Sequence, residues 1–266
     1  TFAGMLWARY KQLDVSVKRM YRLMENAPLT ALVEHSPVDF SAPLPDVTYA
    51  TKTASDRLGE LVASHLTFHY PSSTNGVEDV SLRIKRGSLT VITGRIGSGK
   101  TTLLRTLLGL LPADSGEIKW NGDIITDAGN FFIPPRCSYT AQVPRLFSNS
   151  LRNNILLGMN KSDDEIYEAA KLAVMDRDLE QLDDNLETMV GARGVKLSGG
   201  QMQRTAAARM FIREPELVVF DDLSSALDVE TERQLWERIF ESGKDMTCLV
   251  VSHRRPLLRR ADHIIV

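Results

Sequence analysis

The chain has 266 residues, of which 43% are hydrophobic and 25% are charged, and its formal net charge is -2. A chain of this length and composition can bury the core of one large globular domain. Because there is no basic excess, nucleic acid is not expected as a partner. The two cysteines, Cys137 and Cys248, are far apart and predict neither a disulfide framework nor a zinc site. No apolar run reaches about 18 residues, so we expect no membrane span within these residues.

Residues 1–26 are predicted to form an amphipathic helix, because apolar side chains recur at helical spacing among basic ones. Residues 27–60 have the composition of a linker, with four prolines and no sustained periodicity. The packed domain is expected over residues 61–266. The chain starts without Met and ends within an apolar run, so we expect a piece of a longer polypeptide whose last domain is truncated at its C-terminus.

From residue 61 onward, short apolar runs with β-branched residues alternate with longer helical stretches. This pattern predicts an α/β fold with a mainly parallel sheet. A distinctive polar residue or loop follows each of four runs, which are residues 89–93, 137–141, 217–220 and 248–251. Because the carboxyl ends of parallel strands share one edge of a sheet, where α/β folds bind ligands, we expect these four features to meet there.

Residues 145–205, between the second and third runs, are predicted to be mostly helical. Ser162 and Glu165 have the spacing of a capping box at the start of one of these helices. Apolar and small residues follow on one face, including Ile166 and Ala169. A helical subdomain is therefore expected beside the sheet.

A phosphate-binding loop is indicated between the first run and the helix after it. Its residues match the P-loop pattern, namely Gly94, Arg95, Ile96, Gly97, Ser98, Gly99, Lys100 and Thr101. Glycines let the backbone wrap closely, so that its N–H groups and the helix N-terminus face the phosphates. Lys100 is expected to reach the β- and γ-phosphates, and the Thr101 hydroxyl is expected to ligate Mg²⁺. A glycine-rich turn that merely contains Lys and Thr is the simpler alternative, which the flanking strand and helix disfavour.

The third run leads directly into Asp221, so a buried strand would present a carboxylate to a metal ion or its water shell. Many strands end in Asp, and a strand followed by an Asp-capped turn is the simpler interpretation of this residue by itself. The P-loop is what makes the metal-binding interpretation the stronger one.

A second glycine-rich segment, Leu197-Ser198-Gly199-Gly200-Gln201, precedes an alanine-rich helix. Ser198 is placed as the N-cap of that helix, with exposed backbone donors beside it. By itself this segment could be a tight turn. In its order between the P-loop and Asp221, it resembles the signature of the ATP-binding cassette (ABC) family, and the following Met202-Gln203-Arg204 continues the resemblance.

The resemblance covers nearly all of residues 62–266. It implies the ABC ATPase fold, which is a P-loop NTPase core with a mainly parallel sheet, an antiparallel β portion and a helical subdomain at about residues 145–205. It also implies that Tyr70 stacks on adenine, that Thr102 joins the phosphate contacts, and that residues 225–228 form the D-loop. Gln142 would be the Q-loop glutamine and His253 would sense the γ-phosphate. Taken singly, each has a simpler role, such as a core aromatic for Tyr70.

ATP and Mg²⁺ are the cofactors that the resemblance implies. The metal would be held by Thr101, Gln142 and Asp221, and the catalytic residues would be Lys100, Gln142, Asp222 and His253. Cassettes of this family pair head to tail, so a second nucleotide-binding domain is the expected partner. The nucleotide of that partner would meet Ser198, Gly199, Gly200 and Gln201 of this chain.

Asp222 departs from the family pattern, because the residue after the metal-binding aspartate is usually the glutamate that polarises the attacking water. An aspartate is one methylene shorter, and a misplacement of about 1 Å can cost on the order of 100-fold in rate. We therefore expect slow hydrolysis at this site. Two arrangements stay open, a heterodimeric exporter in which the partner's site carries turnover, and a homodimer that uses Asp222 as a weaker base.

Residues 1–60 resemble the end of a last transmembrane helix that continues into a fused cassette, as in exporters. This implies a transmembrane domain in the same polypeptide and a location at the cytoplasmic face of the cell (inner) membrane. An accessory or oligomerisation helix is the alternative for residues 1–26. For the whole chain, the alternatives are a soluble ABC ATPase without a transport role and a regulatory nucleotide-binding module with little hydrolysis.

Overall fold

The computed structural model describes the chain except for residues 1, 24–48, 192–193, 224–225 and 243–245. Two compact units are distinguished, Thr1–Asp46 and Val47–Val266. In the first unit, α1 spans Phe2–Leu23 and exposes large apolar side chains such as Trp7. Residues 24–26 of the predicted helix and 27–48 of the predicted linker lie outside the described residues. No helix in the described part of the chain has the length and hydrophobicity needed to cross a membrane.

The parallel sheet of the second unit has the strand order β6-β7-β8-β3-β9. Its strands are β3 (Leu89–Ile92), β6 (Cys137–Thr140), β7 (Leu217–Asp221), β8 (Thr247–Val251) and β9 (His263–Ile265). Every residue of β3, β7 and β8 is buried, as expected for strands covered on both faces. The four predicted apolar runs are therefore strands of one parallel sheet, as the sequence indicated.

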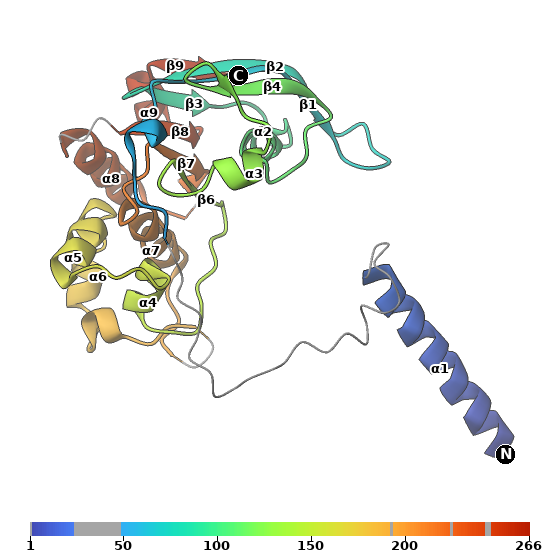
Figure 1. Cartoon of the computed structure of the whole chain (residues 1–266). Coiled ribbons are helices and arrows are strands. Elements are labelled where there is room, and N and C mark those ends of the chain that lie inside the picture. The colour runs from blue at the N-terminus through green and yellow to red at the C-terminus, as the bar shows by residue number, and fades with distance from the viewer. Residues whose placement is uncertain (1, 24–48, 192–193, 224–225, 243–245) are drawn as a thin grey trace. The chain divides into compact units, whose positions relative to one another are not determined.

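A separate antiparallel sheet has the strand order β2-β1-β4-β5. Its strands are β1 (Glu60–His69), β2 (Gly76–Lys85), β4 (Ser115–Trp120) and β5 (Asp123–Ile124). The second unit thus combines a parallel sheet with an antiparallel one, which confirms the predicted fold class. Figure 1 shows the antiparallel sheet at the top of the view and α4–α6 at the lower left, with β6, β7 and β8 between them.

The helices divide into two groups. The first accompanies the sheets and contains α2 (Lys100–Leu107), α3 (Ala128–Phe131), α8 (Val229–Glu241) and α9 (Arg255–Arg260). The second, within the region predicted to be helical, contains α4 (Leu151–Leu156), α5 (Asp163–Leu172), α6 (Asp176–Glu180) and α7 (Gly199–Phe211). Two short 3-10 helices cover Ala54–Asp56 and Asn185–Glu187. The capping box of Ser162 and Glu165 begins α5, as predicted.

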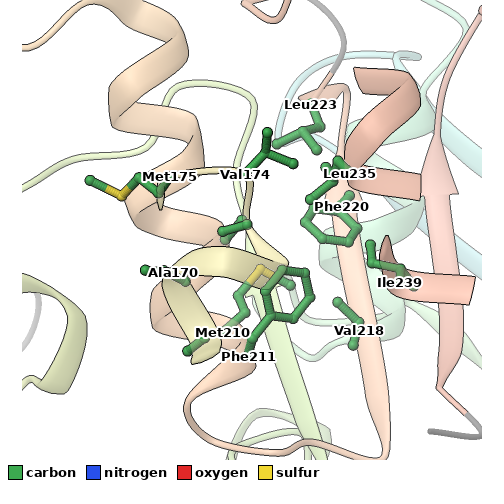
Figure 2. Close-up of a cluster of buried hydrophobic side chains, with 14 of the residues drawn as sticks. Ala170, Val174, Met175, Met210, Phe211, Val218, Phe220, Leu223, Leu235 and Ile239 are labelled. Carbon is green, nitrogen blue, oxygen red and sulfur yellow. The ribbon is translucent and has the colours of Figure 1, made fainter. Parts of the chain in front are cut away.

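Strand β7 contributes to both hydrophobic cores, because alternate side chains of a strand point to opposite faces. Leu217 and Val219 belong to the core around α2, between the two sheets. Val218 and Phe220 face the other core, which α5, α7 and α8 cover, and Figure 2 shows Phe220 among side chains of these helices. A fully buried side chain of this size stabilises the fold by about 1.5–3 kcal/mol. The two cores fix the strand whose end carries Asp221.

The described end of the predicted linker, residues 49–58, packs against the rest of the second unit, and we call it the strap. The Tyr49 hydroxyl donates a hydrogen bond to the Leu157 carbonyl oxygen (2.6 Å). Lys52 Nζ lies 2.7 Å from Glu216 Oε1, while Leu58 N donates to Glu216 Oε2 (2.9 Å). The Leu58 side chain is fully buried. The compact unit therefore begins before the predicted boundary at residue 61.

An ion pair with a buried carboxylate holds the strap near its C-terminal end. Asp56 Oδ1 lies 2.8 Å from Arg136 Nε, just before β6, and the Asp56 side chain is 6% exposed. Its other carboxylate oxygen accepts hydrogen bonds from the backbone N and the hydroxyl of Thr53 (2.8 and 2.7 Å). These contacts, the Thr53 hydrogen bond first, hold the pKa of Asp56 below its ordinary value. The strap is thus anchored at the amino ends of β6 and β7, the edge of the sheet opposite to Asp221.

Candidate functional site

A cleft of about 580 Å³ lies at the carboxyl edge of the parallel sheet. This volume is within the usual range for small-molecule and cofactor sites. Residues from β1–β2, the P-loop and the ends of β6, β7 and β8 form its walls, namely Tyr70, Thr74, Asn75, Gly76, Ile96, Gly97, Ser98, Gly99, Lys100, Thr101, Thr102, Gln142, Asp221, Asp222, Val251 and His253. The features that follow the four predicted strands therefore meet at one place.

The P-loop connects β3 to α2 through a backbone that requires glycine at its end. Gly99 is the N-cap of α2 with a φ of 89°, in the left-handed region that other residues rarely adopt. A Cβ atom at Gly99 would lie 2.9 Å from the Gly76 carbonyl oxygen, so there is also no room for one. This close approach brings the first turn of α2 to the cleft, where its free N–H groups favour an anion.

The Lys100 ammonium group is held by the carbonyl oxygens of the same loop. Its Nζ donates to Gly94 O (3.1 Å) and Arg95 O (2.7 Å). Gly94 and Arg95 do not line the cleft themselves, and their contribution is this pair of contacts. The cation is therefore positioned at the cleft without a carboxylate partner competing in these bonds, and it can turn to a phosphate oxygen.

Asp221 and Thr101 bring together two oxygen atoms that could be ligands of a metal ion. The Thr101 hydroxyl donates to Asp221 Oδ1 (2.9 Å), and the Tyr139 hydroxyl donates to Oδ2 (3.3 Å). Asp221 is 2% exposed, and burial raises its pKa above the ordinary value against the hydrogen bonds of Thr101 and Tyr139. A bound cation would relieve this unfavourable burial of charge.

These donors fit Mg²⁺, which prefers hard oxygen ligands and usually binds one or two carboxylates together with waters and substrate phosphates. Within the described residues no group of three His, Cys, Asp or Glu side chains could hold a metal alone. Thr101 and Asp221 would therefore hold the ion jointly with the phosphates, and the Gln142 side chain lines the same cleft.

Gln142 and Asp222, which both line the cleft, contact each other. Gln142 Nε2 donates to Asp222 Oδ2 (3.0 Å). The Gln142 carbonyl oxygen accepts from Gln203 Nε2 (2.5 Å), which ties the end of β6 to helix α7. Asp222 has a φ of 51°, in the left-handed region. Both side chains reach the cleft, and their mutual hydrogen bond sets how far each one extends into it.

Tyr70 and His253 also line the cleft. Tyr70 is 38% exposed and packs against Phe68 in a T-shaped arrangement, with ring centroids 5.0 Å apart. Its hydroxyl lies 3.4 Å from Thr102 Oγ1. His253 Nδ1 lies 3.3 Å from Thr93 Oγ1. A partly exposed aromatic face and an exposed imidazole are thus available to a ligand.

Ser198, Gly199, Gly200 and Gln201 do not line this cleft. Ser198 is the N-cap of α7, as predicted, and forms a capping box with Gln201. Asp228 of the predicted D-loop is the N-cap of α8, where it accepts hydrogen bonds from the backbone N atoms of Glu230 and Thr231. Ser225 lies outside the described residues. Within one chain, the signature segment and the P-loop therefore belong to different surfaces.

Several contacts of the site were not anticipated from the sequence. Thr74 and Asn75 of the loop between β1 and β2, and Gly76 at the start of β2, line the cleft. The Asn-Gly pair is a turn signal that could have pointed to this loop. Tyr139 supports Asp221 from a neighbouring strand. Its role depends on the pairing of β6 with β7, which motifs in a single sequence do not specify.

Comparisons with known proteins agree with this geometry. The family model described as "ABC transporter" matches residues 77–225, more than half of the chain. The probable multidrug resistance ABC transporter ATP-binding/permease protein YheI of Bacillus subtilis is 38% identical over 210 residues, 78% of this chain and 36% of that protein. The uncharacterized ABC transporter ATP-binding protein YwjA of the same organism is 36% identical over 217 residues, 81% of this chain and 38% of that protein.

A solved structure supports the same assignment. The bacterial Atm1-family ABC exporter with ATP bound has a TM-score of 0.73 and 26% identity, over 98% of this chain and 43% of that chain. The chain thus spans well under half the length of these similar proteins. The matching family model, the similar sequences and the P-loop cleft all lead to one conclusion: the chain belongs to the ABC transporter family.

Proposed function

We propose that the chain is the nucleotide-binding domain of an ABC exporter, which binds ATP with Mg²⁺ and hydrolyses it to drive transport. The observation that carries this proposal is the cleft in which Lys100, Thr101 and Asp221 converge with Gln142 and His253. The similar proteins are ATP-binding/permease chains and an exporter. A transmembrane domain in the same polypeptide and a location at the cytoplasmic face of the membrane belong to the same proposal.

The proposed chemistry is in-line attack of water on the γ-phosphate, in which the protein mainly positions groups and neutralises charge. Lys100 exchanges its contacts with the loop carbonyls for the β- and γ-phosphate oxygens. Asp222 accepts a hydrogen bond from the attacking water, and Gln142 and His253 orient around the γ-phosphate. Mg²⁺, when bound through Thr101 and Asp221, supplies neutralisation of the developing phosphate charge. Tyr70 would stack on the adenine.

We further propose that two copies of such a domain pair head to tail. The signature segment Ser198–Gln201 lies outside the cleft of its own chain, while its serine N-cap and glycine backbone at a helix N-terminus suit a phosphate. A second nucleotide-binding domain, identical or different, would bring its ATP to this segment. Each site would then be completed by the other chain.

The first test is the ATPase rate per molecule of the chain, measured with Mg²⁺ over a range of protein concentrations. A rate that rises with concentration, because each site needs a partner, and that is lost in Lys100→Ala would establish hydrolysis by self-pairing. ATP binding with no turnover at any concentration would count against self-pairing and in favour of an unlike partner. Failure to bind ATP at all would refute the proposed function.

Asp222 stands where related cassettes usually have a glutamate. We propose that the chain therefore forms the slowly hydrolysing site of a heterodimeric exporter. The short Asp222 side chain already accepts a hydrogen bond from Gln142, and the Asp222 backbone is in the left-handed region. In a purified full transporter, Asp222→Glu is expected to raise the rate at this site by about 10- to 100-fold, because the carboxylate reaches the water. Unchanged activity would refute the idea that Asp222 limits the rate.

A further inference from the structure

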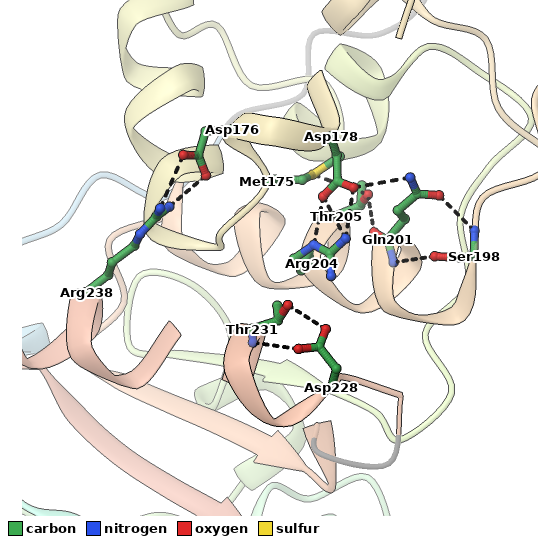
Figure 3. A network of polar contacts seen from close by, with 10 residues as sticks. All are labelled: Met175, Asp176, Asp178, Ser198, Gln201, Arg204, Thr205, Asp228, Thr231 and Arg238. Atoms are coloured by element: carbon green, nitrogen blue, oxygen red, sulfur yellow. Dashed lines mark hydrogen bonds and ion pairs between the residues drawn. The ribbon is translucent and has the colours of Figure 1, made fainter. Parts of the chain in front are cut away.

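Helix α6 carries two aspartates that form ion pairs with different helices. Asp178 contacts Arg204 on α7, with Oδ2 2.8 Å from Arg204 Nε and Oδ1 2.9 Å from the Nη2 atom, a two-pronged arrangement. Asp176 contacts Arg238 on α8, at 2.7 and 3.2 Å. Figure 3 shows both pairs, with Asp178 facing the first turns of α7. The same short helix is thus attached to two neighbours.

The pair of Asp178 and Arg204 is the more protected of the two. Both side chains are 13% exposed, whereas those of Arg238 and Asp176 are 29% and 38% exposed. Bidentate contacts between a guanidinium and a carboxylate are strong and directional, and solvent screens them less when they are partly buried. The orientation of α7 relative to α6 is therefore fixed mainly through Asp178.

Asp178 also contacts the signature segment itself. Gln201 Nε2 donates to Asp178 Oδ1 (3.2 Å), while Gln201 Oε1 accepts from Ser198 N (2.9 Å). The backbone N of Gln201 in turn donates to Ser198 Oγ (3.2 Å). The Gln201 amide is thus held at both ends, by Asp178 on one side and by the capping box on the other (Figure 3).

This arrangement determines which groups the start of the signature segment, Ser198 to Gln201, can present to a ligand. We call these four residues the signature turn. The capping bond uses the Ser198 oxygen as an acceptor, so its O–H group can still donate to an anion. The glycines that follow Ser198 carry the N–H groups of a helix N-terminus, which have no acceptors within the helix. Their direction depends on the cap geometry, and this geometry depends on the position of Gln201.

We propose that Asp178 is a positioning residue for ATP hydrolysis, which fixes the signature turn through Gln201 and Arg204 in the geometry that binds the nucleotide of a second copy. This inference rests on the proposed function, because it requires the signature turn to complete the partner's site. Asp178 does not line the nucleotide cleft of its own chain. Its effect is therefore on the site in the partner and not on nucleotide binding by its own P-loop.

The chain offers a matched control. Asp178→Asn and Asp176→Asn each remove the charge of one aspartate from α6 and weaken one contact with an arginine. Only Asp178 contacts the signature turn. The two variants, the wild type and Lys100→Ala are compared in the 266-residue chain, and their urea midpoints show whether the fold is equally stable.

Hydrogen exchange of the backbone amides of Gln201 and Met202, followed by NMR, reports the signature turn directly. Both amides donate to Ser198 in the described structure, to Oγ and to the carbonyl oxygen. We expect about tenfold faster exchange in Asp178→Asn and no change in Asp176→Asn, because the loss of one bond to a charged group corresponds to a factor of this order. Equal exchange in both variants would overturn the proposal, and this result does not depend on ATPase activity.

The second arm measures ATPase activity and binding of a fluorescent ATP analogue. Asp178→Asn is expected to bind the analogue as the wild type does but to hydrolyse ATP about tenfold more slowly, whereas Asp176→Asn keeps the wild-type rate. An equimolar mixture of Asp178→Asn with Lys100→Ala should regain about a quarter of the wild-type rate, because half of randomly formed pairs are mixed and each has one intact site. A loss of stability alone would give no such recovery.

The outcomes separate the two proposals. If the wild type shows no concentration-dependent ATPase activity, the self-pairing part of the proposed function fails, and the exchange measurement still decides whether Asp178 positions the signature turn. If the wild type is active and the mixture regains no activity, the positioning role of Asp178 in the partner's site is refuted. If Asp178→Asn also loses binding of the ATP analogue, its effect lies in its own chain, which equally refutes the proposal.

Discussion

Asp221 is a carboxylate in an environment that opposes its charge. It ends the buried strand β7, is 2% exposed, and has a pKa that burial raises above the ordinary value. The hydroxyl groups of Thr101 and Tyr139 compensate in part. A group that is unfavourable for the fold and favourable for a cation is typical of a functional site.

Asp221→Asn should therefore separate stability from activity. The amide has the same shape and carries no charge, so we expect a higher urea midpoint at pH 8 than that of the wild type. ATP hydrolysis should fall by about 100-fold or more, because a principal electrostatic contact of the site is lost. Parallel denaturation and ATPase measurements test this, and a lower midpoint at pH 8 would contradict the explanation from burial.

Asp56 presents the opposite case, because its contacts lower its pKa from 3.8. A lowered folded-state pKa contributes stability that is fully present above the unfolded-state pKa and is lost as the pH falls through the folded-state pKa. We expect the wild type to lose more unfolding free energy than Asp56→Asn between pH 6 and pH 3. Urea denaturation across this range checks the difference, and equal losses would show that the contacts of Asp56 with Thr53 and Arg136 do not lower its pKa in solution.

At the scale of elements, the strap is part of the folded domain. The Leu58 side chain is fully buried in the core between the two sheets, and its backbone N donates to Glu216. Leu58→Ala should lower the free energy of unfolding by about 2–5 kcal/mol, the usual cost of emptying a fully buried leucine site. Thermal or urea denaturation measures this, and a change below about 0.5 kcal/mol would be characteristic of a surface substitution and would contradict the described packing.

Gly158, immediately after the residue that accepts the Tyr49 hydrogen bond, tests the other end of the strap. Gly158 has a φ of 90°, and a Cβ atom there would lie 2.4 Å from the Tyr49 hydroxyl. Gly158→Ala is therefore expected to cost about 1–2 kcal/mol of stability. A Tyr49→Ala background removes the collision but not the backbone strain, so it should recover only part of the loss. Complete additivity of the two substitutions would show that they do not interact.

The elements of the site were predictable where a local pattern determines them. The β3-to-α2 loop, the strand before Asp221 and the N-cap at Ser198 each depend on a few adjacent residues, and the structure has them as predicted. The strap was not predictable, because its proline-rich composition is that of a linker and its partners Arg136 and Glu216 are distant in sequence. Asp178 was missed for the same reason, because a lone aspartate on a short helix carries no signal until α6 and α7 are packed.

At the scale of the whole molecule, the second unit contains both hydrophobic cores and the cleft. A chain that starts at Val47 should keep the free energy of unfolding of the 266-residue chain to within about 0.5 kcal/mol, as measured by urea denaturation. A chain that starts at Gly59 lacks the strap and should lose about 2 kcal/mol or more, because Leu58 and the contacts of Asp56 are removed. Equal midpoints for all three chains would place the domain boundary after the strap.

The left-handed backbone at Asp222 has a consequence for how readily this position can change. Aspartate tolerates a positive φ better than glutamate, because its short side chain can bond locally. A glutamate here would gain reach toward the attacking water at a cost on the order of 1 kcal/mol in folding, which is about a fivefold larger unfolded population. Cellular proteases act on that population. A faster variant of this site would therefore accumulate to a lower level in the cell. Natural selection would act on the rate per molecule multiplied by the amount of folded protein.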